Sequence, residues 1–268
     1  MTRLRVGLAL VLALVALALL APVVATHPPH LQLDLATLRA APPSAAHPLG
    51  TDVFSRDLLS RVLHGARVSL AIAGLAVVMA VLLGGTVGIL SGWLGGMVDA
   101  VLMRTVDALM AIPRLFIVLV VLALWERVTV PAMIVILGGT GWFGISRLVR
   151  AEVRAARTRG WVAAARAAGV PDARIVLRHV LPNVAGPVIV AATMGIGQVV
   201  LLEAGLSYLG VGVPQPAPSW GSIIADGQGV LRSAPWIVAS AGGALVATVL
   251  AFTLLGDGLR AWLDPRAP

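Results

Sequence analysis

Residues 68–90 read VSLAIAGLAVVMAVLLGGTVGIL, a stretch without one ionisable side chain. At the α-helical rise of about 1.5 Å per residue it is long enough to cross a hydrocarbon core about 30 Å thick. Residues 6–25, VGLALVLALVALALLAPVVA, form another such stretch after the basic start MTRLR. We expect both to be transmembrane helices. For residues 6–25 we expect an uncleaved anchor, because the apolar part of a signal peptide is normally about 7–15 residues long.

The composition narrows the class of protein. Of the 268 residues, 59% are apolar and 12% are charged, about half the charged fraction of a soluble domain, and the mean hydropathy is +0.96. The chain has no cysteine, which excludes disulfides, thiolate metal sites and cysteine nucleophiles. It has no lysine either, which excludes a P-loop or Schiff-base lysine, so another chain must do any ATP-driven work.

Four more spans are predicted, at about residues 108–124, 128–146, 184–202 and 236–255. The first of these has a short apolar run and must begin near Ala108, which places Pro113 and Arg114 in its early turns. We expect Arg114 to extend to the membrane interface, because at midspan it would cost about 2.5–3.5 kcal/mol on insertion scales.

Small residues within the spans predict close packing of helices, because packing drives helix association in a bilayer. The glycines concerned are Gly84, Gly85, Gly88, Gly138, Gly139, Gly141 and Gly144.

Residues 26–66, between the first two spans, are polar. Prolines prevent a continuous helix in the first half. From Asp52 onward the pattern becomes helical, with Val53, Leu58, Leu59, Val62 and Leu63 able to share an apolar stripe. This indicates an amphipathic surface helix leading into the next span.

Arginines set the expected orientation. The segment between the fourth and fifth spans holds eight arginines and two acidic residues, and so carries +6 of the chain's net charge of +8. The positive-inside rule places this segment in the cytoplasm, and Arg3 and Arg5 place the N-terminus there too. Six spans then put both termini on the cytoplasmic side. Arg39, Arg56, Arg61 and Arg67 on the outer side oppose this assignment, although Asp34, Asp52 and Asp57 nearly cancel their charge.

The same segment predicts a helical hairpin. Residues 161–168 favour a helix, Gly169 suits a left-handed cap, and Pro171 suits the first turn of a second helix. Pro182 is expected to end that second helix just before the fifth span. Such a projecting hairpin could be gripped by a partner protein.

The hairpin resembles the coupling loop of ABC importer permeases, which follows the pattern EAA, three residues, Gly, nine residues, then an aliphatic residue, any residue, Leu and Pro. Ala163, Ala164, Ala165, Gly169, Leu181 and Pro182 fall at these spacings. Ala163 stands in place of the glutamate, and His179 in place of the aliphatic residue. The ending from Arg178 to Asn183, RHVLPN, is similar to that of the dipeptide/oligopeptide/nickel branch.

Further motifs resemble the same branch in order along the chain. They are HPLGTD at 47–52, RDLLSR at 56–61, GARVSL at 65–70, GGMVD at 95–99, MRTVD at 103–107, RLVR at 147–150, EAGLSYLGVGV at 203–213, PSWG at 218–221, GDGLR at 256–260 and DPR at 264–266. Together they cover nearly everything from residue 47 to 266.

The resemblance implies an all-α, polytopic membrane helix bundle of the type I ABC importer permease kind, with six transmembrane helices and a cytoplasmic coupling-helix hairpin. It implies a non-catalytic subunit of the bacterial inner membrane, with no cofactor of its own. The implied partners are a second, homologous permease, two cytoplasmic ATPases and an external substrate-binding protein. The implied cargo is dipeptides or oligopeptides, with nickel or another small solute next.

On this basis we divide the chain into an anchor with its external segment (1–66), a permease domain (67–257) and a cytoplasmic tail (258–268). The residues expected to couple to an ATPase are Ala163, Ala164, Ala165, Arg166, Gly169, Asp172, Arg178, His179, Leu181 and Pro182. Glu203 lies near the outer end of the fifth span, where it either lines the path or a gate, or pairs near the interface.

Alternative interpretations were weighed. A self-sufficient secondary transporter or channel would favour inverted repeats and buried ionisable residues, and a membrane enzyme would need a catalytic motif that is absent here.

Arg104 and Asp107 have the spacing of a local helical pair. His27 and His30 have a possible metal-ligand spacing, but the two prolines between them disfavour the helix that would align them, so no metal site is predicted. The glycines of residues 138–144 lie within a span and do not form a nucleotide loop.

Overall fold

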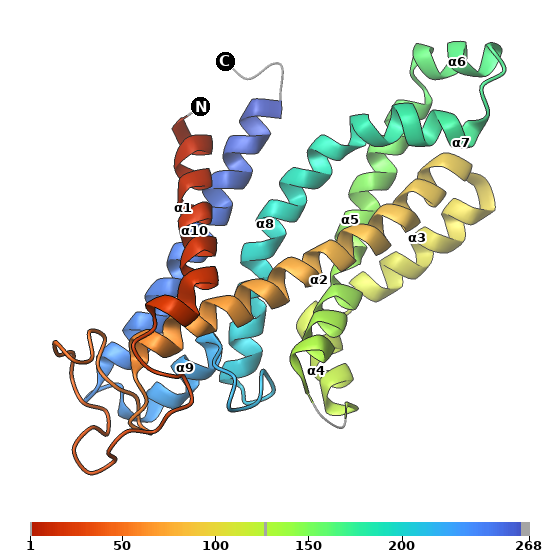
Figure 1. The fold of residues 1–268 in the computed structure, drawn as a ribbon. Coiled ribbons are helices and arrows are strands. Elements are labelled where there is room, and N and C mark those ends of the chain that lie inside the picture. The colour runs from red at the N-terminus through yellow and green to blue at the C-terminus, as the bar shows by residue number, and fades with distance from the viewer. Residues whose placement is uncertain (1, 126–127, 264–268) are drawn as a thin grey trace.

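The computed structural model describes residues 2–125 and 128–263, and every regular element within these ranges is a helix (Figure 1). The α-helices are α1 (Thr2–Val24), α2 (Leu58–Leu94), α3 (Gly96–Met110), α4 (Arg114–Ala123), α5 (Val130–Arg157), α6 (Gly160–Ala167), α7 (Asp172–Ile175), α8 (Leu181–Tyr208), α9 (Trp220–Gly227) and α10 (Pro235–Leu263). A π-helical turn, Val176–Val180, joins α7 to α8, and a 3₁₀ turn, Gln228–Val230, follows α9.

Five of the six expected membrane spans correspond to helices that could cross a bilayer. Five helical stretches are each long and apolar enough to cross a bilayer. They are α1, α2, α5, α10 and the continuous stretch Asp172–Tyr208, which ends in α8. A sixth span is formed if α3 and α4 are taken together, although they meet at an angle of 82°. Helix α1 lies against α10, and the start of α1 and the end of α10 lie at the end of the molecule that carries α6 and α7 (Figure 1). The prediction of a polytopic helix bundle is confirmed.

The third span differs from the prediction. A single helix from Ala108 to Leu124 was expected, whereas α3 already ends at Met110 and α4 begins at Arg114. Pro113 stands at the break in an extended conformation, with φ −55° and ψ 127°. Proline has no amide hydrogen to donate and disfavours the helical region for the residue before it, so a continuous helix through this point is not available.

Arg114 does not reach for the membrane interface as expected. Its Nη2 donates to the carbonyl oxygen of Leu137 at 2.7 Å, and its Nε lies 3.4 Å from the hydroxyl of Thr140, both on α5. The guanidinium therefore joins the start of α4 to the middle of α5. The cost of a charge inside the bundle is offset by these hydrogen bonds within the protein.

Helices α2 and α5 are joined by a line of glycines. A Cβ atom added to Gly84, Gly88 or Gly92 would lie 2.6, 2.6 or 2.9 Å from the carbonyl oxygens of Trp142, Ser146 and Arg150, respectively. The three glycines are spaced four residues apart, so they share one face of α2. We call this contact the glycine seam. Within it the two backbones lie closer than any side chain would permit, which maximises van der Waals contact.

The glycine prediction holds in part. Gly138 and Gly141 of α5 also lie close to α2, whereas Gly85, Gly139 and Gly144 would have open space around an added Cβ. Gly92, which the sequence did not single out, completes the seam.

The segment before α2 also differs from the prediction. Residues 52–57 form a turn rather than the start of an amphipathic helix, because the carboxylate of Asp52 accepts hydrogen bonds from the amides of Phe54 and Arg56 at 2.8 and 2.9 Å. The helix begins at Leu58, since the Asp57 side chain accepts from the amide of Ser60 at 2.8 Å and caps it. It then continues into the span, and its first turns are buried rather than on the surface.

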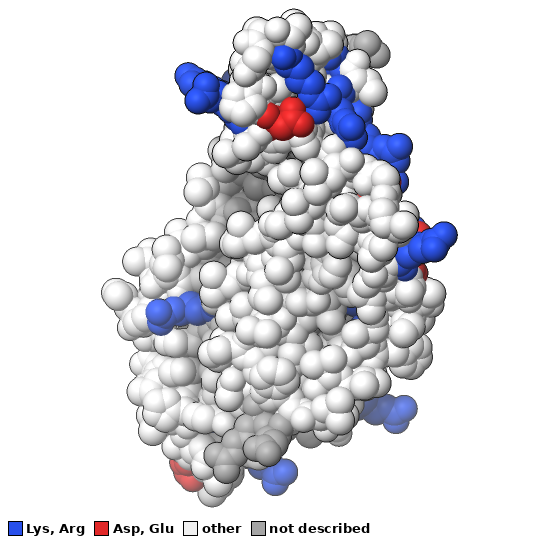
Figure 2. Space-filling view, turned by 90° about the vertical axis from the view of Figure 1, so that its right-hand side faces the viewer, with Lys and Arg blue, Asp and Glu red and all other residues white. Residues whose placement is uncertain are grey.

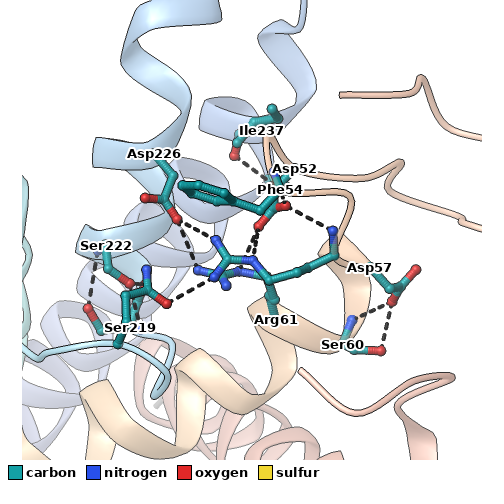
Figure 3. A network of polar contacts seen from close by, with 12 residues as sticks. Asp52, Phe54, Asp57, Ser60, Arg61, Ser219, Ser222, Asp226 and Ile237 are labelled. Atoms are coloured by element: carbon teal, nitrogen blue, oxygen red, sulfur yellow. Dashed lines mark hydrogen bonds and ion pairs between the residues drawn. The ribbon is translucent and has the colours of Figure 1, made fainter. Parts of the chain in front are cut away.

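A buried ionic network holds this segment against α9 (Figure 3). The Arg56 guanidinium contacts Asp52 at 2.6 Å and Asp226 at 2.8 Å, and Arg61 contacts the same two carboxylates at 3.3 and 3.2 Å. Two positive and two negative charges thus compensate one another. Burial raises the pKa of Asp226, and the two arginines counteract that rise. This pairing explains why Arg56 and Arg61 are tolerated on the predicted outer side.

The glycine seam yields a first prediction. Gly88→Ala should lower the melting temperature of the detergent-solubilised chain, because overpacking of this kind typically costs about 1–3 kcal/mol. Gly85→Ala is the matched control: its new methyl group meets nothing, so the better helix propensity of alanine should leave the melting temperature unchanged or slightly higher. Equal effects of the two substitutions would contradict the seam.

Candidate functional site: the hairpin of residues 160–183

The turn of the hairpin forms as its sequence predicts. Gly169 has φ +75°, in the left-handed region that favours glycine, and follows Ala168, the C-cap of α6. Its amide donates to the carbonyl of Arg166 at 2.9 Å, and the amide of Val170 donates to that of Ala165 at 3.1 Å. These bonds satisfy carbonyls at the end of α6. Pro171 then precedes α7 as its N-cap.

The expected stop at Pro182 is absent. The chain passes from α7 through the π-helical turn into α8 without a break, and Pro182 lies in the first turn of α8. In the widened turn the Leu181 amide donates to the carbonyl of Val176, five residues back. The side-chain amide of Asn183 donates to the carbonyl of His179 at 2.6 Å. The π turn therefore adjusts the helix to a proline that lacks a donor.

An apolar core fixes the hairpin to the bundle. Val162 of α6 and Ile175 of α7 are fully buried. They belong to one cluster with residues of α2, α5, the π-helical turn and the start of α8, namely Trp93, Val149, Val153, Ala156, Val176, Val180 and Val184. The hairpin is therefore packed onto the ends of α2 and α5 and does not hang as a free loop.

A polar contact supplements this core. The Arg166 guanidinium binds the Asp172 carboxylate through two nitrogens, at 3.0 and 3.1 Å, and so ties α6 to α7. The indole nitrogen of Trp93 donates to Asp172 at 3.1 Å, and the Arg166 guanidinium lies 4.9 Å from the Trp93 ring centroid. Trp93 lies in the last turn of α2, so its side chain connects α2 directly to the hairpin.

The structure brings the predicted coupling residues together on the projecting end. Ala163, Ala164, Arg166, Gly169, Asp172, Arg178, His179 and Pro182 are exposed, while Ala165 and Leu181 are half-buried. Trp161 and Leu177 add exposed apolar surface. Figure 2 shows basic side chains gathered at this end and an almost uncharged surface below it. A projecting surface of small side chains surrounded by arginines is suited to docking in a groove of another protein.

Sequence reasoning missed a clamp beside the hairpin. Asp99 of α3 accepts from Arg150 of α5 through both oxygens, at 2.5 and 2.6 Å, and also contacts the hydroxyl of Ser91 on α2. Asp107 binds Arg147 of α5 at 2.5 Å, so the predicted local pair of Asp107 with Arg104 is wrong. The GGMVD and RLVR motifs were the available signal, since each supplies one partner of the Asp99–Arg150 pair.

Glu203 lies away from the hairpin and is fully buried. It accepts hydrogen bonds from Ser69 of α2 at 3.1 Å and from Ser207 at 2.7 Å. The Ser219 hydroxyl, just before α9, lies 3.3 Å from that of Ser207. This geometry favours a role in joining α8, α2 and α9, and a gating role for Glu203 stays a prediction.

A cavity of about 310 Å³ lies between α2, α5 and α8. Its walls are largely small or aliphatic side chains, with Gln198 and the Arg114 guanidinium as polar groups. A partly buried arginine beside a cavity inside a membrane helix bundle is uncommon. The cavity therefore has a polar wall that the apolar core lacks.

Comparison with known proteins identifies the class. Residues 84–267 match the family of the binding-protein-dependent transport system inner membrane component, and this chain belongs to that family. It is thus a permease subunit, a multi-pass component of the inner membrane.

Individual relatives extend the likeness to nearly the whole chain. A relative in Brucella suis is 41% identical over 98% of this chain and 87% of its own length. The dipeptide transport system permease protein DppC of Alkalihalophilus pseudofirmus is 36% identical over 97% of this chain and 85% of its own length. The oligopeptide transport system permease protein OppC of Bacillus subtilis is 34% identical, with the same coverage.

The fold has a solved counterpart. A chain of the MetNI methionine ABC transporter, in an inward-facing conformation, superposes with a TM-score of 0.59 over 76% of this chain and 96% of its own length, at 20% identity. The likeness confirms the type I importer permease fold predicted from the sequence.

The packing of the hairpin yields a second prediction. Ile175→Ala should loosen α6 and α7, because burial of an isoleucine in a packed core contributes about 2–5 kcal/mol relative to alanine. Hydrogen exchange of amides 160–175 should accelerate at least tenfold. Leu177→Ala, two residues away and 67% exposed, is the control that should leave exchange unchanged. Unchanged exchange in Ile175→Ala would show that the hairpin does not rely on this core.

Proposed function

We propose that this chain is one of two permease subunits of an ATP-driven peptide importer, and that the hairpin of residues 160–183 receives the motion of a cytoplasmic ATPase. The observation that carries the proposal is a rigid, exposed hairpin packed onto the ends of α2 and α5 in a member of this permease family. The chain itself hydrolyses no ATP, and the partner ATPases supply the energy.

The hairpin suits this role because its two faces differ. Its inner face is fixed to the bundle by Val162, Ile175 and the Asp172–Trp93 hydrogen bond. Its outer face presents alanines and arginines to a partner. A partner that binds the hairpin differently in its ATP-bound and free states can shift the bundle between two conformations. Because Ala163 has no carboxylate, shape and the surrounding arginines, rather than an acidic contact, define the docking.

The charge distribution supports a cytoplasmic hairpin. Residues 147–178 hold eight arginines and form the end of the molecule at which α1 starts and α10 ends (Figure 1), and the positive-inside rule assigns that end to the cytoplasm. The opposite end, with the 26–57 segment and α9, then faces outward. A substrate-binding protein delivers ligand there, in keeping with the family's description as binding-protein-dependent.

Peptides are the proposed cargo, because the named relatives are dipeptide and oligopeptide permeases that align along nearly the full chain. A second, homologous permease completes the path. The family likeness favours this assembly over a self-sufficient secondary transporter.

Coupling can be tested at the turn. Gly169→Val should abolish ATP-linked peptide uptake while the complex still inserts and assembles, because a left-handed conformation costs an L-residue roughly 1–2 kcal/mol and a β-branched one more. Gly160→Val is the control, since an added Cβ meets nothing at either glycine and only Gly169 has positive φ. Uptake is measured in proteoliposomes containing the whole transporter. Normal uptake by Gly169→Val would refute the proposed turn.

Orientation can be tested by labelling, because the natural chain contains no cysteine. An impermeant maleimide applied from outside should label Ala45→Cys in the external segment but not Arg157→Cys beside the hairpin. Both positions are exposed, so accessibility from one side of the membrane alone decides the result. The reverse pattern would invert the proposed topology.

A further inference from the structure

At the end of the molecule opposite the hairpin, two histidines and an aspartate from separate parts of the chain meet. His27 follows α1, His47 lies in the HPLGTD motif, and Asp57 caps α2. One ring nitrogen of each histidine and one carboxylate oxygen of Asp57 all lie within 4.8 Å of one another. The sequence analysis predicted no metal site at His27 and His30, whereas the fold brings His27 beside a histidine twenty positions further along.

The hydrogen bonds of this cluster set both imidazoles in one protonation pattern. His47 donates through Nδ1 to the Asp57 carboxylate at 2.9 Å. The Thr26 hydroxyl also donates to Asp57, at 3.2 Å, and so offers its oxygen to Nδ1 of His27 at 3.0 Å. In a neutral imidazole this pattern places the proton on Nδ1 and the lone pair on Nε2. No residue in the described ranges forms a hydrogen bond with either Nε2.

This is the arrangement of a metal-binding histidine, whose second nitrogen is normally held by a carboxylate or another acceptor. The ring centroids of His27 and His47 lie 5.2 Å apart, with planes tilted by 37°. Two imidazoles bound to one tetrahedral Zn²⁺, with Zn–N distances of about 2.0–2.1 Å, place their ring centroids about 5 Å apart. The observed ring spacing is close to this value.

The charge of the cluster also favours a cation. Asp57 is fully buried, and among the described residues its only ion-pair partner is His47. Asp52, five residues earlier, is by contrast paired with two arginines. No arginine in the described ranges pairs with Asp57, so its carboxylate has no permanently charged partner there.

We propose that His27 and His47 bind a divalent transition-metal ion of the Zn²⁺ class through their Nε2 atoms, with Asp57 orienting His47 and water completing the coordination. Nitrogen ligands select Zn²⁺, Ni²⁺ or Cu²⁺ over the hard cations Mg²⁺ and Ca²⁺. A bound ion would join the segment that follows α1 to the HPLGTD motif that precedes α2. This inference does not depend on the proposed transport function.

The test uses the whole transporter, purified with a histidine-free tag, and ZnSO₄ as the probe. Isothermal titration should show one Zn²⁺ fewer per copy of this chain in His27→Ala than in the unmodified complex. Zn²⁺ should raise the melting temperature of the unmodified complex by a few degrees and that of His27→Ala by less, while MgSO₄ changes neither. His27 is only half-buried, so the variant should fold.

Two further variants separate the site from general effects. Asp57→Asn keeps an N-cap for α2 but removes the carboxylate, and should weaken Zn²⁺ binding by about 10–100-fold. His64→Ala is the control, because His64 lies on α2 with its Nδ1 bound to the Ser60 carbonyl, outside the cluster. Equal Zn²⁺ uptake by the unmodified complex and His27→Ala would overturn the proposal. So would a loss of Zn²⁺ from His64→Ala as large as that from His27→Ala.

Discussion

The close contact of α2 with α5 is the constraint on which the rest of the structure depends. In a bilayer the lipid is as apolar as the side chains, so helices are held together by close packing rather than by exclusion of water. Gly84, Gly88 and Gly92 leave one face of α2 without side chains at these three positions and let the α5 carbonyls approach it. Helices α2 and α5, which have the most extensive contact of any helix pair in the described residues, thereby form one unit. The other helices pack against this unit.

Both ends of this unit carry specialised structure. At one end Trp93, the next residue after the seam, supports the hairpin, and Asp99 clamps α3 to Arg150 of α5. At the other end Arg61, in the first turns of α2, lies in the buried network with Asp226 of α9. A displacement of the hairpin can therefore reach the opposite end through packed helices. A rigid connection of this kind is the physical requirement for coupling to a separate motor, since a loosely attached loop would absorb the movement.

The polar groups buried near the 26–57 segment are balanced in different ways. Asp52 is compensated by arginines, Glu203 by serine hydroxyls, and Asp57 by hydrogen bonds alone. Burial of a charge is costly unless hydrogen bonds or counter-charges replace the lost water. The segment therefore holds its shape without regular secondary structure, because its side chains supply the hydrogen bonds that a helix would otherwise form.

Much of the fold could be read from local pattern. Runs of apolar residues located five spans, and Gly169 located the hairpin turn, because hydropathy and left-handed backbone are properties of a residue and its immediate neighbours. Errors arose where two local signals competed. Pro113 broke a helix that hydropathy continued, and Pro182 was accommodated by a π turn that no residue pattern announced.

What the amino-acid sequence determined by itself is a polytopic helical membrane protein with a basic hairpin before the span that ends in α8. The tertiary structure alone decided which polar side chains meet. Asp107 pairs with Arg147 rather than with Arg104, and His27 lies beside His47 rather than beside His30. The physical reason is range. Burial in lipid and turn geometry act within a few residues, whereas partner choice depends on which helix faces lie against each other after packing, and that packing is set by contacts far apart in the chain.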